Sequence, residues 1–541
     1  MSTLNPIHSR LSAIKSHQSQ VRVIDATQAA GDEDLLKEIG YKQELNRKFK
    51  TYQIFGIAYS VMGILPGVAS VSSIGLAGGP AAFVWGWFVT SIMILTIAVA
   101  MSENASAIPT SGGLYYWTYV YAPERFRVLF SYIIGMTNAM SLCAALVSVS
   151  YGLAEEILAI VVIQKDGNFD VTEGRTYAVF AAGVIVAAIG TCVSSRNVAT
   201  LQTVSGVANT LVMFIFLVAL PIGASQADFG RRDAKFIFGH VKSYSDWSTG
   251  WQFCLAWMAA IWSIGAFDSP VHMSEEAQNA TYGVPLGIIS AVGVCAFGGW
   301  ACVLCLVACM KPDVAAVLDT ETGFPFAQIC YDALGKKWAI GIMSLTAVCQ
   351  WLCAASILTA LSRQIWAFAR DDGLPFSSIV KVVNKRLRVP IRAVIFATVV
   401  ALMIGCLCLA GPTAANALFS LGVSGNYVSW STPTLLRLTS GRSVFRPGAF
   451  YLGKVLSPIV GWISCLWTAF VLVLCMFPSN KTVEKDTMNY NVVISCGVWI
   501  LSFIYFFVYK YKHFHGPRSN LEDDDDEEPL KVDMVLEDKL A

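Results

Sequence analysis

GIAYSVMGILPGVAS, residues 56–70, belongs to an apolar run of membrane length that glycine, proline and polar residues interrupt at mid-depth. A matching interruption, IWSIGAFDSPVHMSEEA (261–277), occurs in the second half of the chain. A helix that breaks inside a bilayer leaves amide and carbonyl groups unpaired, and because hydrocarbon cannot solvate them, the break survives only where it lines a cavity or binds a ligand. Paired breaks at corresponding positions of two halves indicate the binding site of a secondary transporter.

The composition also predicts an all-α polytopic membrane protein. Of the 541 residues, 55% are hydrophobic and 14% are charged, and the mean hydropathy of +0.57 is too high for a soluble globular chain. A helix needs about 20 apolar residues to cross a bilayer. We therefore predict twelve transmembrane helices, at residues 52–75, 80–102, 128–163, 176–194, 201–224, 250–273, 284–310, 339–362, 390–411, 413–436, 455–477 and 488–509.

Weak internal similarity predicts how these helices are organised. IPTSGGLYYWTYVYAPER (108–125) and GFPFAQICYDALGKK (323–337) share an order of glycine, proline, aromatic and basic residues. This similarity favours a 5+5 inverted repeat with broken helices 1 and 6, followed by two extra helices. The predicted parts are a cytosolic N-terminal segment, two repeats, a pair of helices and an acidic cytosolic tail, at residues 1–50, 51–224, 225–437, 438–511 and 512–541.

Charge predicts the orientation and excludes some partners. With a cytosolic N-terminus, 27 of the 38 Lys and Arg residues fall on the inner side, as the positive-inside rule requires, so both termini should face the cytosol of a plasma or vacuolar membrane. The net charge of +1 implies no nucleic-acid partner. Most of the 15 cysteines lie in predicted helices without neighbouring His or carboxylate groups, so we expect no metal site and no cofactor. Oligomeric state is open.

Several stretches resemble a known family. SENASAIPTSGGLYYWTYVYAPE (102–124), SEEAQNA (274–280) and SRQIWAFARDDGLP (362–375) are similar to signature loops of the amino acid and choline transporters, within the amino acid, polyamine and organocation superfamily. GDEDLLKEIGYKQELNRKF (31–49) and LTSGRSVFRPGAFYLGK (438–454) closely resemble the fungal GABA permeases. The resemblance extends over about residues 22–521.

The resemblance implies a secondary transporter, not an enzyme, that carries GABA by alternating access, with proton coupling and possible acceptance of putrescine. A choline or polyamine carrier and a transporter-like nutrient sensor remain alternatives. Several bacterial relatives carry a fifth-helix lysine whose protonation replaces a sodium ion, but the corresponding position here is Asn209. Another group must then carry the proton, and sodium coupling stays open.

The two breaks suggest how a small zwitterion could be held. Backbone amides around Gly63 to Gly67 would begin a half-helix with Pro66 in its first turn, and a helix N-terminus attracts a carboxylate. A plain proline kink is the structural alternative. In the second break, an intramembrane carboxylate such as Asp268 is costly without a purpose. It could accept the substrate amine, carry the proton, or only cap the broken helix. His272 follows one helical turn later, and histidine is the side chain that ordinarily titrates near physiological pH, although a lone His at a helix end more often only hydrogen-bonds locally.

Further polar and aromatic residues at mid-span could complete the cavity, although packing between helices is the usual role of such residues. Trp257 is expected to flank the second break. The full set of predicted substrate-site residues is Tyr59, Ser60, Gly63, Gly67, Asn138, Trp262, Gly265, Phe267, Asp268, Gln350 and Asn426, with Asp268 as the candidate for proton coupling.

Three further expectations concern regions outside the cavity. LLKEIGYKQELNRKF (35–49) is amphipathic and should lie against the inner membrane face. The basic loop SRQIWAFARDDGLP should contain an inner latch, formed by Arg370 with Asp371 or Asp372. The glutamates near the helix ends should be solvated, and these are Glu103, Glu155 and Glu156.

Overall fold

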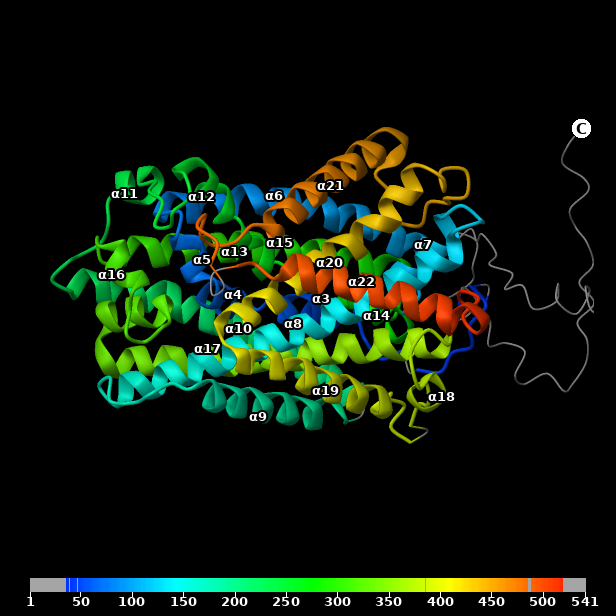
Figure 1. Ribbon diagram of the computed structural model, residues 1–541, viewed down its shortest axis with the longest axis horizontal. Coiled ribbons are helices and arrows are strands. Elements are labelled where there is room, and N and C mark those ends of the chain that lie inside the picture. The colour runs from blue at the N-terminus through cyan, green and yellow to red at the C-terminus, as the bar shows by residue number, and fades with distance from the viewer. Residues whose placement is uncertain are drawn as a thin grey trace, which may run out of the picture.

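The computed structural model describes residues 36–518 except 38, 46, 194, 385 and 485–487. Residues 1–35 of the predicted N-terminal segment and 519–541 of the predicted acidic tail lie outside the described residues. Within the described part every regular element is a helix, and the only β-type pairing is an isolated bridge between Phe49 and Ala277. The helices pack side by side along the long axis of the molecule (Figure 1).

Ten helical segments in the described residues are long and apolar enough to cross a membrane. They are α3 and α4 (Thr51–Met62 and Ile64–Ser70), α6 (Pro80–Ala107), α8 (Arg127–Gln164), α9 (Glu173–Thr191), α10 (Ser195–Gln226), α15 (Ala280–Ala308), α17 (Pro325–Arg370), α19 (Ile391–Gly405) with η2 (Cys406–Ala410), α21 (Gly453–Met476) and α22 (Asn491–Val508).

The other two predicted segments are also helical. Residues 250–273 form a broken helix composed of α12 (Thr249–Leu255), α13 (Met258–Ser263) and α14 (Ser269–His272). Residues 413–436 lie in α20 (Pro412–Leu438), whose Ser, Thr, Asn and Gly residues make it less apolar than its neighbours. The prediction of an all-α polytopic membrane protein with broken first and sixth helices is confirmed.

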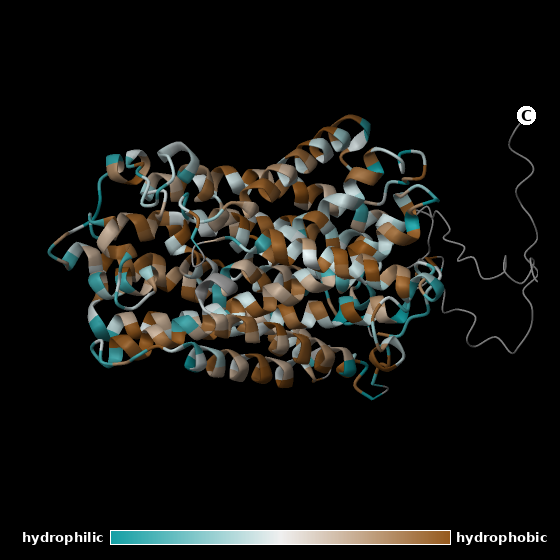
Figure 2. Ribbon diagram, in the orientation of Figure 1, coloured by the Kyte–Doolittle hydropathy of each residue, from teal (hydrophilic) through white to brown (hydrophobic). Residues whose placement is uncertain are grey.

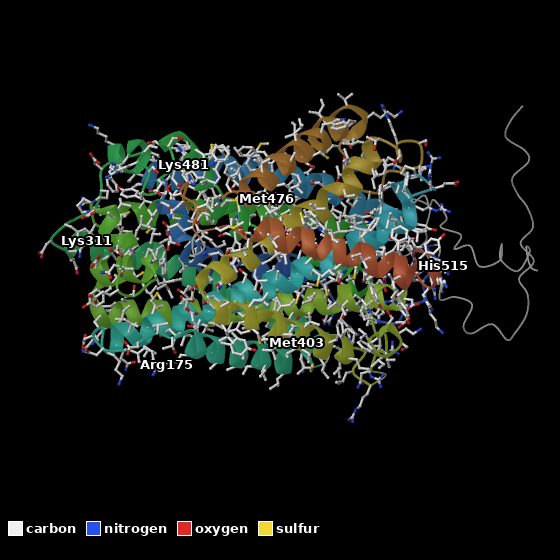
Figure 3. All side chains as sticks on the ribbon, in the orientation of Figure 1. Arg175, Lys311, Met403, Met476, Lys481 and His515 are labelled. Atoms are coloured by element: carbon white, nitrogen blue, oxygen red, sulfur yellow. The ribbon has the colours of Figure 1, made fainter. Side chains whose placement is uncertain are left out.

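Short helices and loops close the two ends of the bundle. They are α5 (Ser72–Leu76), α11 (Ala234–Gly239) and α16 (Val314–Leu318) at one end, and α7 (Gly113–Tyr121), η1 (Ser274–Glu276), α18 (Ser377–Val380) and η3 (Lys510–Lys512) at the other. We name these the outer and inner ends, after the topology predicted from charge. Hydrophilic residues gather at both ends in Figure 2, and Figure 3 places Lys311 at the outer end and His515 at the inner end.

The two broken helices run antiparallel to each other. The α4 half of the first packs against α13 of the sixth, and α3 packs against α14. Gly63 separates α3 from α4 with φ of +41°, a left-handed conformation that favours glycine. In the sixth helix the left-handed residue is Ala266, with φ of +52°, rather than Gly265. Each break therefore lies opposite the other at the centre of the bundle.

Two expectations about the inner end are corrected. The basic stretch from residue 362 is not a loop, because α17 continues as a helix to Arg370. A kink at Gly335, with φ of +71°, separates its first turns from the long segment that follows. The described part of 35–49 does not lie against the membrane either. Tyr41, Leu45 and Phe49 are buried within the protein, since backbone groups of this segment pair with residues that follow the second break.

Candidate functional site

A cavity lies where the two breaks meet. Five elements surround it, namely the first helix around Gly67, α8, the second break, α17 and α20. None of the lining residues carries a charged side chain, and they are Val61, Met62, Gly67, Ala145, Val149, Ile261, Trp262, Ser263, Gly265, Ala266, Gln350, Cys353, Ile357, Phe419, Gly422, Val423, Asn426, Tyr427 and Trp430.

Five of the residues predicted for the site line this cavity: Gly67, Trp262, Gly265, Gln350 and Asn426. The indole nitrogen of Trp262 donates a hydrogen bond to Ser148 Oγ at 3.0 Å, which fixes the ring at the cavity wall. The amide of Gln350 donates to the Val149 carbonyl at 3.1 Å. Both side chains are therefore oriented by α8 without any ligand.

Unpaired polar atoms converge on the same cavity. Ser263 Oγ, Asn426 Oδ1 and Trp430 Nε1 are buried and have no hydrogen-bond partner among the described residues. Buried polar atoms are almost always paired in folded proteins, so an unpaired group that lines a cavity indicates a position for a ligand or for water. The first amides of the half-helix α4, those of Ile64 and Leu65, also have no backbone acceptor in the described part, although neither residue is among those that line the cavity.

Three predicted residues of the first helix do not line the cavity. The Tyr59 hydroxyl shares a hydrogen bond of 3.0 Å with Thr210 on α10. Ser60 bonds Ser205 on α10 and also Ser356 on α17, at 2.7 Å to the latter. Gly63 is the hinge between α3 and α4, and a Cβ there would lie 2.2 Å from Cys353 Sγ. Tyr59 and Ser60 therefore join helices, which is the usual role of polar side chains in membranes.

The remaining three, Asn138, Phe267 and Asp268, form a layer on the inner side of the cavity. The Phe267 ring packs on the cavity-lining Trp430 with centroids 4.2 Å apart. Behind it, Asn138 Nδ2 donates to Asp268 Oδ2 at 2.9 Å, and His272 Nε2 lies 3.3 Å from the same oxygen. Asp268 occupies the N-cap position of α14, but its side chain accepts no capping hydrogen bond.

Toward the outer end the cavity adjoins a wide vestibule. The two spaces share Trp262, Phe419 and Val423 as lining residues. Glu155 is the single charged side chain among the described residues of the vestibule, and it is exposed there as predicted. The cavity thus lies directly beside the outer vestibule and is separated from it by Trp262, Phe419 and Val423.

Toward the inner end the path is closed by a buried polar layer. Arg370 donates two hydrogen bonds to Glu275, of 2.9 and 3.0 Å, and its guanidinium lies 3.9 Å from the centroid of the Tyr41 ring. Asp371 accepts hydrogen bonds from Tyr41 at 3.0 Å and from Tyr115 at 2.6 Å. Burial raises the pKa of the Asp371 carboxyl above its ordinary value, while Arg370 and the tyrosine donors oppose that shift.

This layer corrects the predicted latch in one respect. Arg370 pairs with Glu275, which follows the second break, and not with Asp371 or Asp372. Asp372 pairs instead with Lys510 at 3.2 Å. A second buried pair, Arg363 with Glu276 at 2.9 Å, joins α17 to the same η1 turn. The inner closure thus ties the half-helix α14 to α17 and to the N-terminal segment.

Two glutamates expected to be solvated are buried. Glu103 at the inner end of α6 accepts hydrogen bonds from Arg437 on α20 and from Ser457 on α21, both of 2.7 Å. Glu156 on α8 is 2% exposed. The prediction failed because sequence places a residue near a helix end but does not show which neighbouring helix covers it.

Sequence reasoning missed Ser263, Cys353, Phe419, Tyr427 and Trp430 as cavity residues. One signal was available for α20. Its lining positions are spaced by three or four residues along one helix face, the pattern of a continuous stripe. They are Phe419, Gly422, Val423, Asn426, Tyr427 and Trp430.

Comparison with known proteins agrees with this architecture. Residues 49–514 match the family described as amino acid permease. The chain is 53% identical over 98% of its length to the GABA-specific permease of Saccharomyces cerevisiae, covering 94% of that protein. It is 31% identical over 93% of its length to an uncharacterized amino-acid permease of Schizosaccharomyces pombe, covering 91% of that chain. It is 32% identical over 90% of its length to the amino-acid permease BAT1 homolog of Oryza sativa subsp. japonica, covering 95% of that chain.

Proposed function

Because this chain belongs to the amino acid permease family and is therefore a membrane transporter and not an enzyme, we propose that it carries 4-aminobutyrate (GABA) by alternating access. The observation that carries the proposal is the uncharged cavity between two broken helices, which adjoins a vestibule at the outer end and is closed at the inner end by buried ion pairs. The printed name of the Saccharomyces cerevisiae relative supports the substrate.

The cavity favours a molecule with no net charge. Its lining residues supply dipoles and aromatic faces but no counter-ion, and an unbalanced charge at the membrane interior is costly. GABA is a zwitterion whose two ends compensate each other. Putrescine, a dication, and choline, a cation, lack this compensation, so we expect both to be weaker substrates than GABA.

The two ends of the zwitterion have distinct partners in this proposal. The carboxylate lies at the unpaired amides that begin α4, where donors and the positive end of the half-helix coincide. Trp430 Nε1 and Ser263 Oγ offer further donors from the cavity wall. The ammonium group lies toward Asn426 Oδ1 and the ring of Trp262, which can make a cation–π contact. Gln350 and Gly265 bound the space between them.

Transport then requires the two ends of the bundle to open in turn. The vestibule gives the cavity an outer entrance, and the inner closure must separate before substrate can leave. With both termini in the cytosol, this direction brings GABA toward the cytosol from the outer side of a plasma or vacuolar membrane. Asp268, the buried carboxylate of the second break, supplies the proton-coupling group.

Counterflow in proteoliposomes containing the purified full-length chain tests this function. Labelled GABA outside should enter faster when unlabelled GABA is trapped inside, because a carrier exchanges substrate. A competition panel of GABA, putrescine, choline and neutral α-amino acids at two pH values then ranks the substrates. Counterflow with another member of the panel but not with GABA would contradict the substrate assignment, and no counterflow with any member would contradict the carrier mechanism.

The inner closure yields a separate prediction. Arg370→Glu removes the bidentate pair and places a carboxylate beside Glu275 and Asp371, and breaking a buried ion pair costs about 3–5 kcal/mol. We expect uptake per molecule at the membrane to fall at least about tenfold, because a bundle that cannot close at its inner end cannot keep the outer-open state.

Two further variants separate this role from a general folding defect. Arg442→Glu is the matched control, since Arg442 is exposed at the same end, and it should transport like the parent. Exchanging the charges, with Arg370→Glu and Glu275→Arg together, should restore part of the activity. Normal uptake and abundance in Arg370→Glu alone would remove the latch.

A further inference from the structure

Asp268 and His272 form a fully buried pair on the inner side of the cavity. Both side chains are 0% exposed, and His272 Nε2 lies 3.3 Å from Asp268 Oδ2. The other ring nitrogen, Nδ1, lies 3.1 Å from the backbone carbonyl oxygen of Ser111, in the loop before α7. Asn138 on α8 donates to the same carboxylate oxygen. The pair thus contacts two other elements of the bundle, α8 and the loop before α7.

The chemistry of these contacts fixes the number of protons that the pair holds. A carbonyl oxygen only accepts, so Nδ1 of His272 must carry a hydrogen. If His272 were neutral and Asp268 ionised, the lone pair of Nε2 would face a carboxylate oxygen, and no hydrogen bond could form between them. The contact is satisfied when His272 is the imidazolium, or when Asp268 is the neutral acid that donates to Nε2. Each of these states contains one proton more than the neutral imidazole with a free carboxylate.

The second carboxylate oxygen strengthens this conclusion. Asp268 Oδ1 is buried without a hydrogen-bond partner among the described residues. A bare oxygen on an ionised carboxylate is costly in a low-dielectric interior unless a positive charge lies beside it. We infer that the Asp268–His272 pair is the site that binds the transported proton, an inference that rests on the proposed symport function and adds His272 as the partner of Asp268.

The charged groups near the pair have other partners. The ionisable groups nearest along the same chain segment, Glu275 and Glu276, are paired with Arg370 and Arg363 of α17. The elements packed against α14 are α3, α15, α17 and η1. In the described part, neither Asp268 nor His272 forms an ion pair with any other ionisable side chain of these four elements. Those side chains include Tyr52 and Tyr59 on α3, and Tyr282, Cys295, Cys302 and Cys305 on α15.

The same contacts couple proton release to the inner opening. Asn138 and Ser111 belong to elements other than α14, so separation of α14 from α8 and from the loop before α7 removes both partners of the pair. Water that enters from the inner end can then solvate an ionised Asp268 and a neutral His272. In the closed state, the packed rings of Phe267 and Trp430 separate the pair from the cavity. The proton is therefore released toward the inner end, when α14 separates from these partners.

Proteoliposomes with the full-length chain test the inference through His272→Gln. Wild-type protein with one proton per substrate should accumulate GABA about tenfold per unit of imposed pH gradient. In the variant we expect accumulation to fall to about onefold and substrate-driven alkalinisation of the outer medium to disappear, while counterflow stays within about threefold of wild type. His240→Gln is the matched control, because His240 bonds Tyr244 in the outer part of the molecule, away from the pair.

The outcomes separate the two proposals. If wild-type protein exchanges another amine but not GABA, the substrate assignment fails and the His272 measurement is made with that amine. Full pH-driven accumulation in His272→Gln would overturn the proton site. Loss of both counterflow and accumulation in His272→Gln and also in the permanently charged His272→Arg would overturn it too, since the residue would then serve substrate binding or closure rather than the proton.

Discussion

Gly67→Val is expected to lower the kcat/KM of GABA uptake by about tenfold to a hundredfold while the protein still reaches the membrane. Gly67 lines the cavity, and a Cβ there would lie 3.2 Å from the Met62 carbonyl oxygen and 3.3 Å from Ser263 Cβ and Oγ. Overfilling a packed site costs about 1–3 kcal/mol, and every 1.4 kcal/mol is a factor of ten in binding.

A glycine with open surroundings provides the control for this effect. Gly293 lies within α15, and a Cβ there meets no atom within 4 Å, so Gly293→Val should leave uptake and abundance near those of the parent. Surface abundance and the KM for labelled GABA distinguish lost binding from lost protein. An unchanged KM in Gly67→Val would show that substrate does not approach this backbone.

Gly63→Val tests the hinge rather than the substrate contact. A Cβ at Gly63 would clash with Cys353 Sγ, and the φ of +41° is strained for any other residue. We therefore expect a greater loss of folded protein than in Gly67→Val, measured as detergent-solubilised monodisperse transporter.

The sequence was sufficient to locate the two breaks, because Gly63, Pro66 and the polar residues around Asp268 are incompatible with a continuous helix in lipid. It was not sufficient to orient the side chains next to them. Tyr59 and Ser60 precede the first break by one turn, but α3 turns them toward α10, while Val61 and Met62 face the cavity. These four residues lie in the same helix α3 before the break, so which of them faces the cavity depends on how α3 packs against its neighbours.

At the inner closure, too, the sequence identified residues but not the partners they pack against. Arg370 was recognisable as a latch residue from its position, but its partner Glu275 lies 95 residues earlier in the sequence. The buried segment around Tyr41 looked like an interfacial helix because its apolar face is indistinguishable from one that packs on protein. Local pattern determines which residues avoid water; it does not determine whether lipid or protein covers them.

Asp268→Asn should abolish GABA accumulation driven by a pH gradient and retain exchange. The substitution preserves the shape and a hydrogen-bonding group, but it cannot hold the proton shared with His272. Accumulation should fall from about tenfold per pH unit to about onefold, whereas counterflow at saturating GABA should stay within about threefold. Asp319→Asn, at an exposed position in the outer loop after α16, is the control and should accumulate GABA normally.

The three roles considered for Asp268 predict different results in this variant. A direct contact with the substrate amine would raise the KM for counterflow as well, but the cavity lining stops at Ala266 and the rings of Phe267 and Trp430 lie between. A capping role predicts almost normal transport, but the side chain accepts no hydrogen bond from the amides of α14. Wild-type accumulation and KM in Asp268→Asn would therefore contradict both functional roles. Loss of accumulation with intact exchange is the result that only a proton-binding carboxylate explains.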